Sequence, residues 1–431
     1  MNDLPESWTI EPFSQVAQYT TGRTPARANN TFWAKGANQV PWVAISDMEE
    51  YGTIIETAEA ISDVAFQQVF RERIVPAGTL LMSFKLTIGR VATLGVPACH
   101  NEAIISIYPR KGVDQRYLGY FLSQVDYTDH QDRQIKGNTL NQSKIDQIQV
   151  MLPPPSAQAS IADVLDKCRL GINTERAAEA TAQDLKRATL RQLFTHGLRR
   201  EAQKETEIGL VPESWRVVPL GSLGKIGNGS TPKKTVSAYW NGGTFPWLTS
   251  AKVYDREIET ADQFVTDIAL AECHLPRVRP GAVLMAITGQ GKTLGHCAVL
   301  KLEASINQHV AYLQTDTERA DPSFVRGYLE TQYEYLRQVA SGGGSTKGAL
   351  TCAFLRDLPV PLPPTLDEQR EIVTILDTLD RKISLHRQKR SVLEELFQSL
   401  LHKLMTGKIS AADLDLSALS SASTQREETA A

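Results

Sequence analysis

The sequence predicts an α/β (α+β) protein made of two homologous domains, each followed by one long helix. Three observations carry this prediction: an internal repeat with an offset of about 207 residues, a proline-rich exit from each copy, and about 39 residues of helical spacing after each exit. At 431 residues the chain is long enough for two or three domains that each bury a core. We therefore expect a duplicated architecture rather than a single domain.

The repeat is an ordered series of short motifs, and each motif occurs twice in the same order. Small changes in the offset between motifs indicate loop insertions. The matching pairs are LPESWTIEPF (4–13) and VPESWRVVPL (211–220), TGRTPARANNTFW (21–33) and NGSTPKKTVSAYW (228–240), VPWVAISDM (40–48) and FPWLTSAKV (245–253), PAGTLLMS (76–83) and RPGAVLMA (279–286), TIGRVA (87–92) and TLGHCA (293–298), and NEAI (101–104) and NQHV (307–310).

Each copy contains the elements of a mixed α/β domain. Short apolar runs, such as 79–82, 91–94 and 103–107, are bounded by Gly, Pro and Asn, as β-strands are. Segments 115–126 and 322–338 have helical apolar spacing. The motifs LPPP and LPPT then end each domain, since proline interrupts a strand or helix interior but is tolerated in a first helical turn.

Long helices are predicted at roughly 157–194 and 366–404, each about 58 Å long at ~1.5 Å per residue. The second has alternating steps of four and three, which is typical of a coiled-coil seam. Its seam positions are Ile372, Leu376, Leu379, Ile383, His386, Arg390, Leu393, Phe397, Leu400 and Leu404. The corresponding, weaker seam of the first helix is Ile161, Leu165, Cys168, Ile172, Glu175, Glu179, Ala182, Lys186, Thr189 and Leu193. Single surface helices are the alternative.

Composition restricts the class of protein without identifying it. The net charge is −3, so any nucleic-acid-binding face must be local or completed by a partner. No targeting or membrane-spanning segment is evident, so we expect a cytoplasmic protein. Five scattered cysteines indicate neither a disulfide framework nor a zinc ribbon, and we predict no metal site. They are Cys99, Cys168, Cys273, Cys297 and Cys352.

Several of these motifs together resemble one known family. The P-E-S-W opening, the G-x-T-P loop followed by a tryptophan, the N-x-x-V/I strand, and the L-P-P exit into a helix ending LFTHG or LMTGK are similar to those of type I restriction-modification specificity (S) subunits. The resemblance covers about residues 1–408 and implies antiparallel helices and a pseudo-twofold repeat. The implied division is target recognition domain 1 (1–155), helical spacer 1 (156–209), target recognition domain 2 (210–363), helical spacer 2 (364–408) and a disordered tail (409–431).

The resemblance also implies a function in DNA recognition. Such a subunit binds a bipartite, asymmetric double-stranded DNA site, one half-site per domain, and has no catalytic activity of its own. Its implied partners are two methyltransferase (modification) subunits bound to the helices, and restriction (endonuclease/translocase) subunits. No cofactor is expected in this chain; S-adenosylmethionine, ATP and magnesium are expected in the partner subunits.

Glycine-rich loops are the predicted reading elements, because their backbone can approach phosphates while nearby polar side chains reach base edges. Solvated loop residues without a DNA contact are the alternative at each position. The candidates are Lys85, Arg90, Lys136, Asn138 and Thr139, then Gln290, Lys292, Ser345, Thr346 and Lys347. The six tryptophans are predicted to be core anchors rather than stacking platforms.

Three other functions compete with this reading. AITGQGKT at 286–293 nearly spells a phosphate-binding loop, which would make the chain a nucleotide-binding enzyme. The copy at 82–90 has no such loop, and Gly295 interrupts the helix that should follow. A methyltransferase should carry Asp or Asn before Pro-Pro, where this chain has Leu. A standalone DNA-binding regulator would leave the long helices without a role.

An electrostatic register is predicted in the middle of the helix pair. Antiparallel pairing of the seam ends, Ile161 with Leu404 and Leu193 with Ile372, sets Glu175 against Arg390 and Glu179 against His386. Opposite charges in the central layers would disfavour shifted registers. Solvent-facing charges without pairing are the alternative, because Lys186 opposite Leu379 fits the seam poorly and must extend toward solvent.

Overall fold

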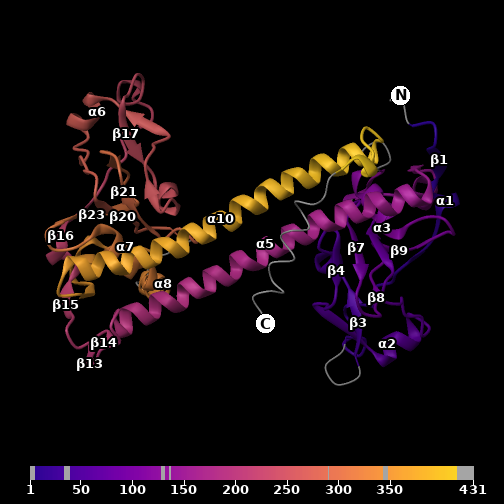
Figure 1. The fold of residues 1–431 in the computed structure, drawn as a ribbon, viewed down its shortest axis with the longest axis horizontal. Coiled ribbons are helices and arrows are strands. Elements are labelled where there is room, and N and C mark those ends of the chain that lie inside the picture. The colour runs from indigo at the N-terminus through magenta and orange to yellow at the C-terminus, as the bar shows by residue number, and fades with distance from the viewer. Residues whose placement is uncertain are drawn as a thin grey trace. The chain divides into compact units, whose positions relative to one another are not determined.

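The computed structural model describes residues 5–33, 39–127, 132–134, 137–289, 291–342 and 348–414. The chain divides into two compact units, which are considered separately below (Figure 1). Unit 1 comprises Met1–Glu175 and Lys389–Ala431, and unit 2 comprises Arg176–Gln388. The long helices α5 (Pro155–His196) and α10 (Leu366–Met405) each contribute one end to each unit. They occupy the two segments in which the sequence predicted long helices.

Unit 1 is built on a five-stranded sheet with the order β2-β9-β6-β7-β4, a three-stranded sheet with the order β5-β3-β8, and two strand pairs. In the large sheet, β7 and β4 pair in parallel and the other neighbours are antiparallel. In the small sheet, β3 pairs with β8 in parallel and with β5 antiparallel. The strands are β1 (Thr9–Pro12), β2 (Ala17–Thr21), β3 (Gln39–Val43), β4 (Gly52–Ile54), β5 (Glu59–Ser62), β6 (Leu80–Ser83), β7 (Val91–Leu94), β8 (Cys99–His100), β9 (Ile104–Pro109), β10 (Asp132–Gln134), β11 (Gly137–Thr139) and β12 (Gln149–Leu152). The short helices are α1 (Phe13–Val16), η1 (Ile45–Asp47), α2 (Asp63–Gln68), α3 (Gln115–Gln124) and α4 (Gln142–Asp146).

Unit 2 repeats both sheets of unit 1 and its β1–β12 pair, and it has the pair β13–β14 where unit 1 has β10–β11 as its second pair. Its sheets have the orders β16-β23-β20-β21-β18 and β19-β17-β22, and β15 pairs with β24 as β1 pairs with β12. The duplication predicted from the sequence is therefore confirmed. The strands are β13 (Gln203–Thr206), β14 (Gly209–Pro212), β15 (Arg216–Pro219), β16 (Gly224–Asn228), β17 (Phe245–Leu248), β18 (Glu257–Ile258), β19 (Gln263–Val265), β20 (Ala282–Ala286), β21 (Cys297–Leu300), β22 (Ser305–Ile306), β23 (Val310–Thr315) and β24 (Pro359–Leu362). The short helices are η3 (Leu220–Leu223), η4 (Ser237–Tyr239), η5 (Ser250–Tyr254), α6 (Asp267–Glu272), α7 (Pro322–Thr331), α8 (Tyr333–Gly342) and α9 (Cys352–Asp357).

The central strand of each large sheet is buried on both faces. All residues of β6 and of β20 are buried, which explains why these segments are continuous apolar runs rather than alternating ones. One side of each sheet packs against the helix that follows the last strand, α3 in unit 1 and α7 in unit 2. Each central strand is thus a fixed support for the loop that leaves its carboxyl end.

The two copies differ after the helix that covers the sheet. In unit 2 the helical segment predicted at 322–338 is two helices, because α7 ends at Thr331 and α8 begins at Tyr333. Unit 1 has the hairpin of β10 and β11 in the corresponding part of the chain. The local sequence accounts for the second helix of unit 2, since YEYLRQVASG is an amphipathic helical segment.

A buried glutamine in each long helix attaches the domain to that helix. Gln158 Oε1 accepts a hydrogen bond from the Asp114 backbone N–H (2.8 Å), and Gln369 Oε1 accepts one from the Asp321 backbone N–H (2.8 Å). The two aspartates are the N-caps of α3 and α7. Gln158 is 2% exposed and Gln369 is 1% exposed. Because the two contacts are equivalent, both copies join their sheet-covering helix to their long helix in the same way.

Within each unit, the ends of α5 and α10 pack against one another through the predicted seam. In unit 1, Ile161, Leu165, Cys168 and Ile172 share a core with Phe397, Leu400 and Leu404. In unit 2, Leu193 shares a core with Ile372 and Leu376. A Cβ atom at Gly171 would lie 3.4 Å from Leu393 Cδ1, as expected if neighbouring Ile172 faces Leu393. These contacts support the antiparallel seam and argue against single surface helices.

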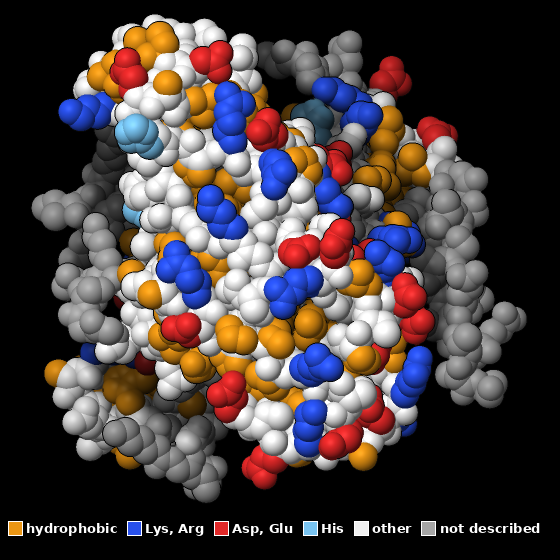
Figure 2. Space-filling model, turned by 90° about the vertical axis from the view of Figure 1, so that its left-hand side faces the viewer, with side chains coloured by type: hydrophobic (Ala, Val, Ile, Leu, Met, Phe, Trp, Pro, Cys, Tyr) orange, Lys and Arg blue, Asp and Glu red, His pale blue; other side chains and the backbone are white. Residues whose placement is uncertain are grey.

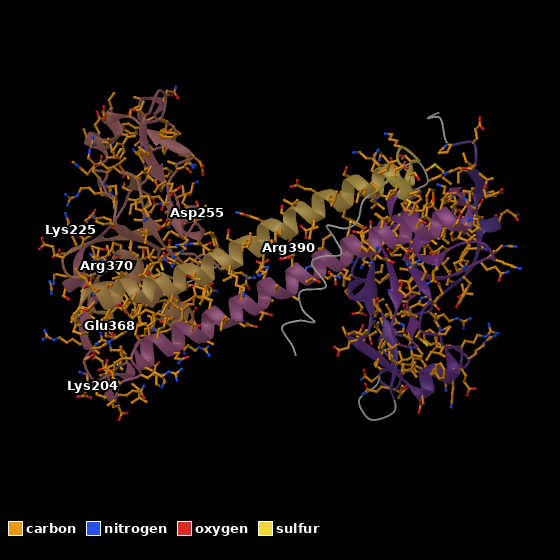
Figure 3. All side chains as sticks on the ribbon, viewed as in Figure 1. Lys204, Lys225, Asp255, Glu368, Arg370 and Arg390 are labelled. Carbon is orange, nitrogen blue, oxygen red and sulfur yellow. The ribbon has the colours of Figure 1, made fainter. Side chains whose placement is uncertain are left out.

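Two segments at the edges of the repeats also pack onto the folded units: the start of the second repeat, and the residues that follow α10. In unit 2 the Trp215 side chain is fully buried, and its indole N–H donates to Glu368 Oε1 at 3.1 Å. Glu368 lies in the first turn of α10 (Figure 3). In unit 1, Ile409, Ala411 and Leu414, which the sequence assigned to a disordered tail, pack against the core. Residues 415–431 lie outside the described part of the chain.

Candidate nucleic-acid interface

Four loop segments that are far apart in the sequence meet at one end of the sheets in each unit. They are the G-x-T-P loop, the loop after the central strand, the N-x-x turn and the end of the glycine-rich segment. We call the described parts of them the recognition loops; in unit 1 they are 22–25, 84–90, 101–103 and 137–140, and in unit 2 they are 229–232, 287–289 with 291–296, 307–309 and 348–350. Backbone hydrogen bonds described below connect each loop to the next.

The G-x-T-P loop packs against the N-x-x turn so closely that only glycine fits. A Cβ atom at Gly22 would lie 2.1 Å from the His100 carbonyl oxygen, and one at Gly229 would lie 1.8 Å from the Ile306 carbonyl oxygen. The next residue in each loop donates its backbone N–H to the same carbonyl, at 2.9 Å from Arg23 and 3.0 Å from Ser230. The repeated glycine is therefore required by space.

His100, at the start of this contact in unit 1, is a structural residue. Its Nε2 lies 2.6 Å from Ser106 Oγ, and its Nδ1 lies 3.1 Å from the Asn101 carbonyl oxygen. Burial lowers the pKa of His100 to about 4, so the ring is neutral at pH 7. It holds the turn and contributes no charge to a nucleic-acid surface.

The loop after each central strand is fixed by the N-x-x turn on one side and the glycine-rich segment on the other. In unit 1, Phe84 donates its N–H to the Ala103 carbonyl (2.9 Å) and accepts from the Leu140 N–H (3.0 Å). In unit 2, Ile287 donates to the His309 carbonyl (2.9 Å) and accepts from the Leu350 N–H (2.8 Å). In each unit, a residue just after the predicted glycine-rich segment is thus bonded to the loop after the central strand; that these segments read DNA stays a prediction.

Aromatic side chains hold the rest of the loop in unit 2. Tyr333 Oη donates to the Lys292 carbonyl (2.6 Å), and Arg337 Nη1 donates to the Gly291 carbonyl (2.7 Å). Tyr254 Oη and Thr293 Oγ1 lie 2.9 Å apart. Two main-chain carbonyls of the loop are thus bonded, and the Lys292 side chain is exposed.

In each unit, a pair of tryptophans packs beside the G-x-T-P loop. Trp33 and Trp42 are edge to face with ring centroids 5.1 Å apart, as are Trp240 and Trp247. The Trp42 indole donates to the Arg23 carbonyl at 3.0 Å. Trp42, Trp215 and Trp247 are buried, and Trp8, Trp33 and Trp240 are partly buried. The prediction that the tryptophans are core anchors is confirmed for the three buried ones.

Of the predicted reading residues, the side chains of Lys85, Arg90 and Lys292 are described. Lys85 is partly exposed, with its Nζ 5.2 Å from the centre of the Phe84 ring. Arg90 Nη1 donates to the Ile45 and Met48 carbonyls, at 3.3 Å each, so it also fixes the start of the loop. Asn138 and Thr139 lie in β11, but their side chains are not among the described ones; Lys136, Gln290, Ser345, Thr346 and Lys347 lie outside the described residues.

The predicted helix-register residues lie where α5 and α10 pass from one unit to the other. Glu179 Oε1 accepts hydrogen bonds from Arg387 Nε (3.1 Å) and Nη2 (3.0 Å), one residue beyond the predicted partner His386. Arg390 Nε lies 3.5 Å from Glu394, within its own helix. The pairings Glu175–Arg390 and Glu179–His386 stay predictions.

Sequence reasoning missed several polar side chains on the recognition loops. Thr24 Oγ1 bonds Glu102, and the equivalent Thr231 bonds Gln308. In unit 2, Thr288 Oγ1 lies 2.5 Å from His309 Nδ1. The signal was present, because Glu102, Gln308 and His309 directly follow the repeated asparagine of the N-x-x motif.

The phosphate-binding-loop alternative does not fit the backbone. In a phosphate-binding loop the residues after the lysine begin a helix, whose N-terminus faces the phosphates. Here Thr293–Gly295 form a turn, and the chain continues as strand β21. The alternative that residues 286–293 bind a nucleotide in this way is wrong, because the required strand-loop-helix unit is a strand-loop-strand unit.

One face of the molecule has no single dominant charge. Figure 2 shows Lys and Arg side chains interspersed with Asp and Glu on that face. Within the described residues, no three His, Cys, Asp or Glu side chains come together as metal ligands. None of the described helices is both long and apolar enough to span a membrane. The chemistry available on the recognition loops is hydrogen bonding by backbone amides and by Lys, Thr, Gln and His side chains.

Comparison with known proteins agrees with this architecture. The family model "Type I restriction modification DNA specificity domain" matches residues 5–182 and 212–395, one match per repeat. The type I restriction enzyme MjaVIII specificity subunit of Methanocaldococcus jannaschii is 22% identical over 424 residues, which is 96% of this chain and 95% of that protein. The MjaIX specificity subunit of the same organism is 28% identical over 197 residues, 45% of this chain and 44% of that protein.

Solved structures share the fold. The S subunit of a type I restriction-modification system from M. genitalium matches with a TM-score of 0.58 and 13% identity, covering 94% of this chain and 97% of that one. A chain from a study of complex assembly and conformational transition in the type I R-M system matches with a TM-score of 0.58 and 20% identity, covering 95% and 100%. At these identities the likeness concerns the fold alone.

Proposed function

The chain belongs to the family of type I restriction-modification specificity subunits, which recognise DNA sequences, and we propose that it reads a bipartite DNA site with one half-site per recognition domain. The observation that carries this proposal is the duplicated set of recognition loops on a duplicated topology. Two homologous readers in one chain can bind two half-sites, as the two halves of a symmetric dimer do.

The two half-sites are proposed to differ in sequence, because equivalent loop positions carry different chemistry. Lys85 of the first domain corresponds to Thr288 of the second, and Glu102 corresponds to Gln308. A lysine donates only, a carboxylate accepts only, and an amide does both, so the two loops favour different base edges. An asymmetric target follows from these substitutions.

We propose that this chain performs no methyl transfer or DNA cleavage, and that it assembles two modification subunits and restriction subunits around the DNA. The sequence lacks the Asp/Asn-Pro-Pro motif of an amino-methylating enzyme, and both Pro-Pro runs follow leucine. The methyl donor, ATP and magnesium would then act in the partners. Methyl transfer to DNA by the purified chain alone, supplied with S-adenosylmethionine, would contradict this assignment.

Exchange of one domain tests the proposed division of labour. Replacing residues 210–360 with the corresponding domain of another family member should change one half of the methylated target and leave the other half unchanged. The measurement is sequencing of methylated sites in cells that also carry the methyltransferase partner, with the parent chain as control. A simultaneous change in both half-sites would show that the domains do not read independently.

The long helices are proposed to set the distance between the half-sites. Inserting four residues after Ala180 lengthens α5 by ~6 Å, which at ~3.4 Å per base pair corresponds to at most about two base pairs. The preferred gap in the target should therefore grow by one or two base pairs. A fully active complex with an unchanged gap would show that the helix length does not fix the spacing.

A further inference from the structure

Unit 2 contains a cavity of about 910 Å³ where its domain meets the two long helices. Its walls come from α5, α10, α7, η5 and the turn before β21, and all its lining residues belong to this one unit. One wall is the root of the recognition loop 287–296, because Gly295 and His296 line the cavity. A ligand bound there would lie beside the proposed reading surface.

Positive charge dominates the lining. Seven of the lining residues are Lys or Arg, and three are Asp or Glu. The cationic residues are Lys186, Arg187, Arg191, Arg256, Arg326, Arg381 and Arg387, and the acidic ones are Glu330, Glu334 and Asp380. Burial, and then the nearby Arg326 guanidinium, lower the pKa of Arg256, which indicates how closely the cations are placed. A ligand that fills this space must compensate positive charge.

The floor of the cavity is an ionic network with fixed geometry. Lys186 Nζ lies 2.5 Å from a Glu330 oxygen and 2.8 Å from an Asp380 oxygen. Arg326 lies 3.2 Å from Glu330 and 3.7 Å from Asp380. Lys186 is 8% exposed and Arg326 is 5% exposed. These cations are largely neutralised by their partners and are held in place, so they form the base of the site rather than its free contacts.

The free cationic groups lie at the rim. Arg191 of α5 and Arg381 of α10 are exposed, and among the described residues neither has an acidic partner. Arg187 and Arg387 also line the rim, whereas the carboxylates that they contact, Asp184 and Glu179, are not lining residues. The rim therefore presents guanidinium groups to an incoming anion from both long helices.

The equivalent place in unit 1 is filled by aromatic rings. The seam equivalence of Ile161 and Ile372 puts Phe397 of unit 1 at the position of Lys186 of unit 2, and the motif alignment puts Tyr51 at the position of Arg256. Tyr51 lies 5.5 Å from Phe397 and 5.3 Å from Tyr120, centroid to centroid. The partly buried Arg169 lies over the Tyr51 ring, but no described Lys or Arg of unit 1 is buried, so domain packing alone does not require the buried cations of unit 2.

We propose that this cavity binds phosphate groups of the DNA backbone next to the half-site read by the second domain. The inference rests on the proposed function, and it adds a sequence-independent contact made by the long helices. Guanidinium groups form paired hydrogen bonds with phosphate oxygens, and such contacts position a protein on a duplex. His296 and Tyr333 both line the cavity, with ring centroids 4.7 Å apart and planes tilted by 51°, so a phosphate held there would also orient the loop that ends at His296.

The test uses the full chain with Arg191→Ala and Arg381→Ala combined, since neither residue belongs to the buried network. Binding of a duplex that contains the complete target, and of an unrelated duplex, is measured between about 50 and 200 mM salt. Each phosphate contact contributes about 0.9 to the slope of log affinity against log salt. The slope should become shallower by about one to two, and affinity should fall about tenfold at low salt for both duplexes.

The matched control is Lys204→Ala combined with Arg370→Ala. Both are cationic residues of unit 2 outside the cavity lining, on β13 and in the first turns of α10 (Figure 3). This variant should keep the parent salt slope. An unchanged slope in the Arg191→Ala/Arg381→Ala chain, while the parent discriminates target from unrelated DNA, would overturn the cavity proposal and leave the proposed function intact. A parent chain without any discrimination would instead contradict the proposed function, and the cavity proposal with it.

A second arm separates DNA from small phosphate compounds. Inorganic tripolyphosphate should compete with DNA only weakly for the parent chain, because a duplex offers many phosphates at once. Tight tripolyphosphate binding that the two arginine substitutions abolish, without any change in DNA affinity, would assign the cavity to a small ligand and refute the DNA proposal. If an acidic peptide, rather than tripolyphosphate, showed this binding behaviour, the DNA proposal would be refuted equally.

Discussion

Replacing Lys186 with methionine is expected to lower the free energy of unfolding of unit 2 by about 3 kcal/mol. Methionine keeps the length of the side chain but removes its charge, so Glu330 and Asp380 lose the cation that lies between them. Removing one partner of a buried ion pair costs about 3–5 kcal/mol, and the partial exposure of Glu330 places this case at the lower end. Urea unfolding, monitored by amide hydrogen exchange in α7, would measure the loss in the free energy of unfolding.

The control for this substitution is Arg187→Met, one residue away. Arg187 and its partner Asp184 are about two-thirds exposed, so this variant should unfold within about 0.5 kcal/mol of the parent. Adding Asp380→Asn to Lys186→Met should recover part of the loss, because Arg256 and Arg326 also contact Asp380 and the second change removes the carboxylate that those two cations would otherwise have to share with Glu330. A Lys186→Met chain as stable as the parent would mean that the network contributes nothing to unit 2.

The fold was predictable because its signals are local and occur twice. The G-x-T-P loop, the P-E-S-W opening and the L-P-P exit mark turns and boundaries through residue types with restricted backbones, and the structure has them at equivalent places in both copies. The heptad spacing predicted the seam for the same reason, since a helix brings every third or fourth residue to one face.

Side-chain partners were predictable only where a repeat position constrains them. Lys186 was expected to extend toward solvent from a poor seam position, and the structure corrects this: it is 8% exposed and contacts Glu330 and Asp380. Its partner Glu330 is on α7, which is 144 residues away in the chain, and nothing in the helix pattern specifies that approach. The same holds for Arg90, whose bonds to backbone carbonyls depend on the fold of another loop.

Substituting Gly229 with alanine is expected to destabilise unit 2 by about 3 kcal/mol, at the upper end of what overpacking of a closely packed site costs. The added methyl group would lie 1.8 Å from the Ile306 carbonyl oxygen and 2.4 Å from the carbonyl carbon, and neither backbone atom can move without its strand. The G-x-T-P loop must then shift. That shift breaks the Ser230–Ile306 hydrogen bond and the contact of the Trp247 indole with the Ser230 carbonyl (3.1 Å).

Because this contact belongs to the recognition loops of one domain, the functional loss should be one-sided. Gly229→Ala should abolish discrimination in the half-site read by the second domain and leave the other half-site unchanged, whereas Gly22→Ala should do the reverse. Gly342→Ala is the control, since its added methyl group has no neighbour within 4 Å. Thermal unfolding and binding to duplexes altered in one half-site at a time would measure both effects. Parent-like stability and discrimination in Gly229→Ala would show that the loop does not approach Ile306 this closely in solution.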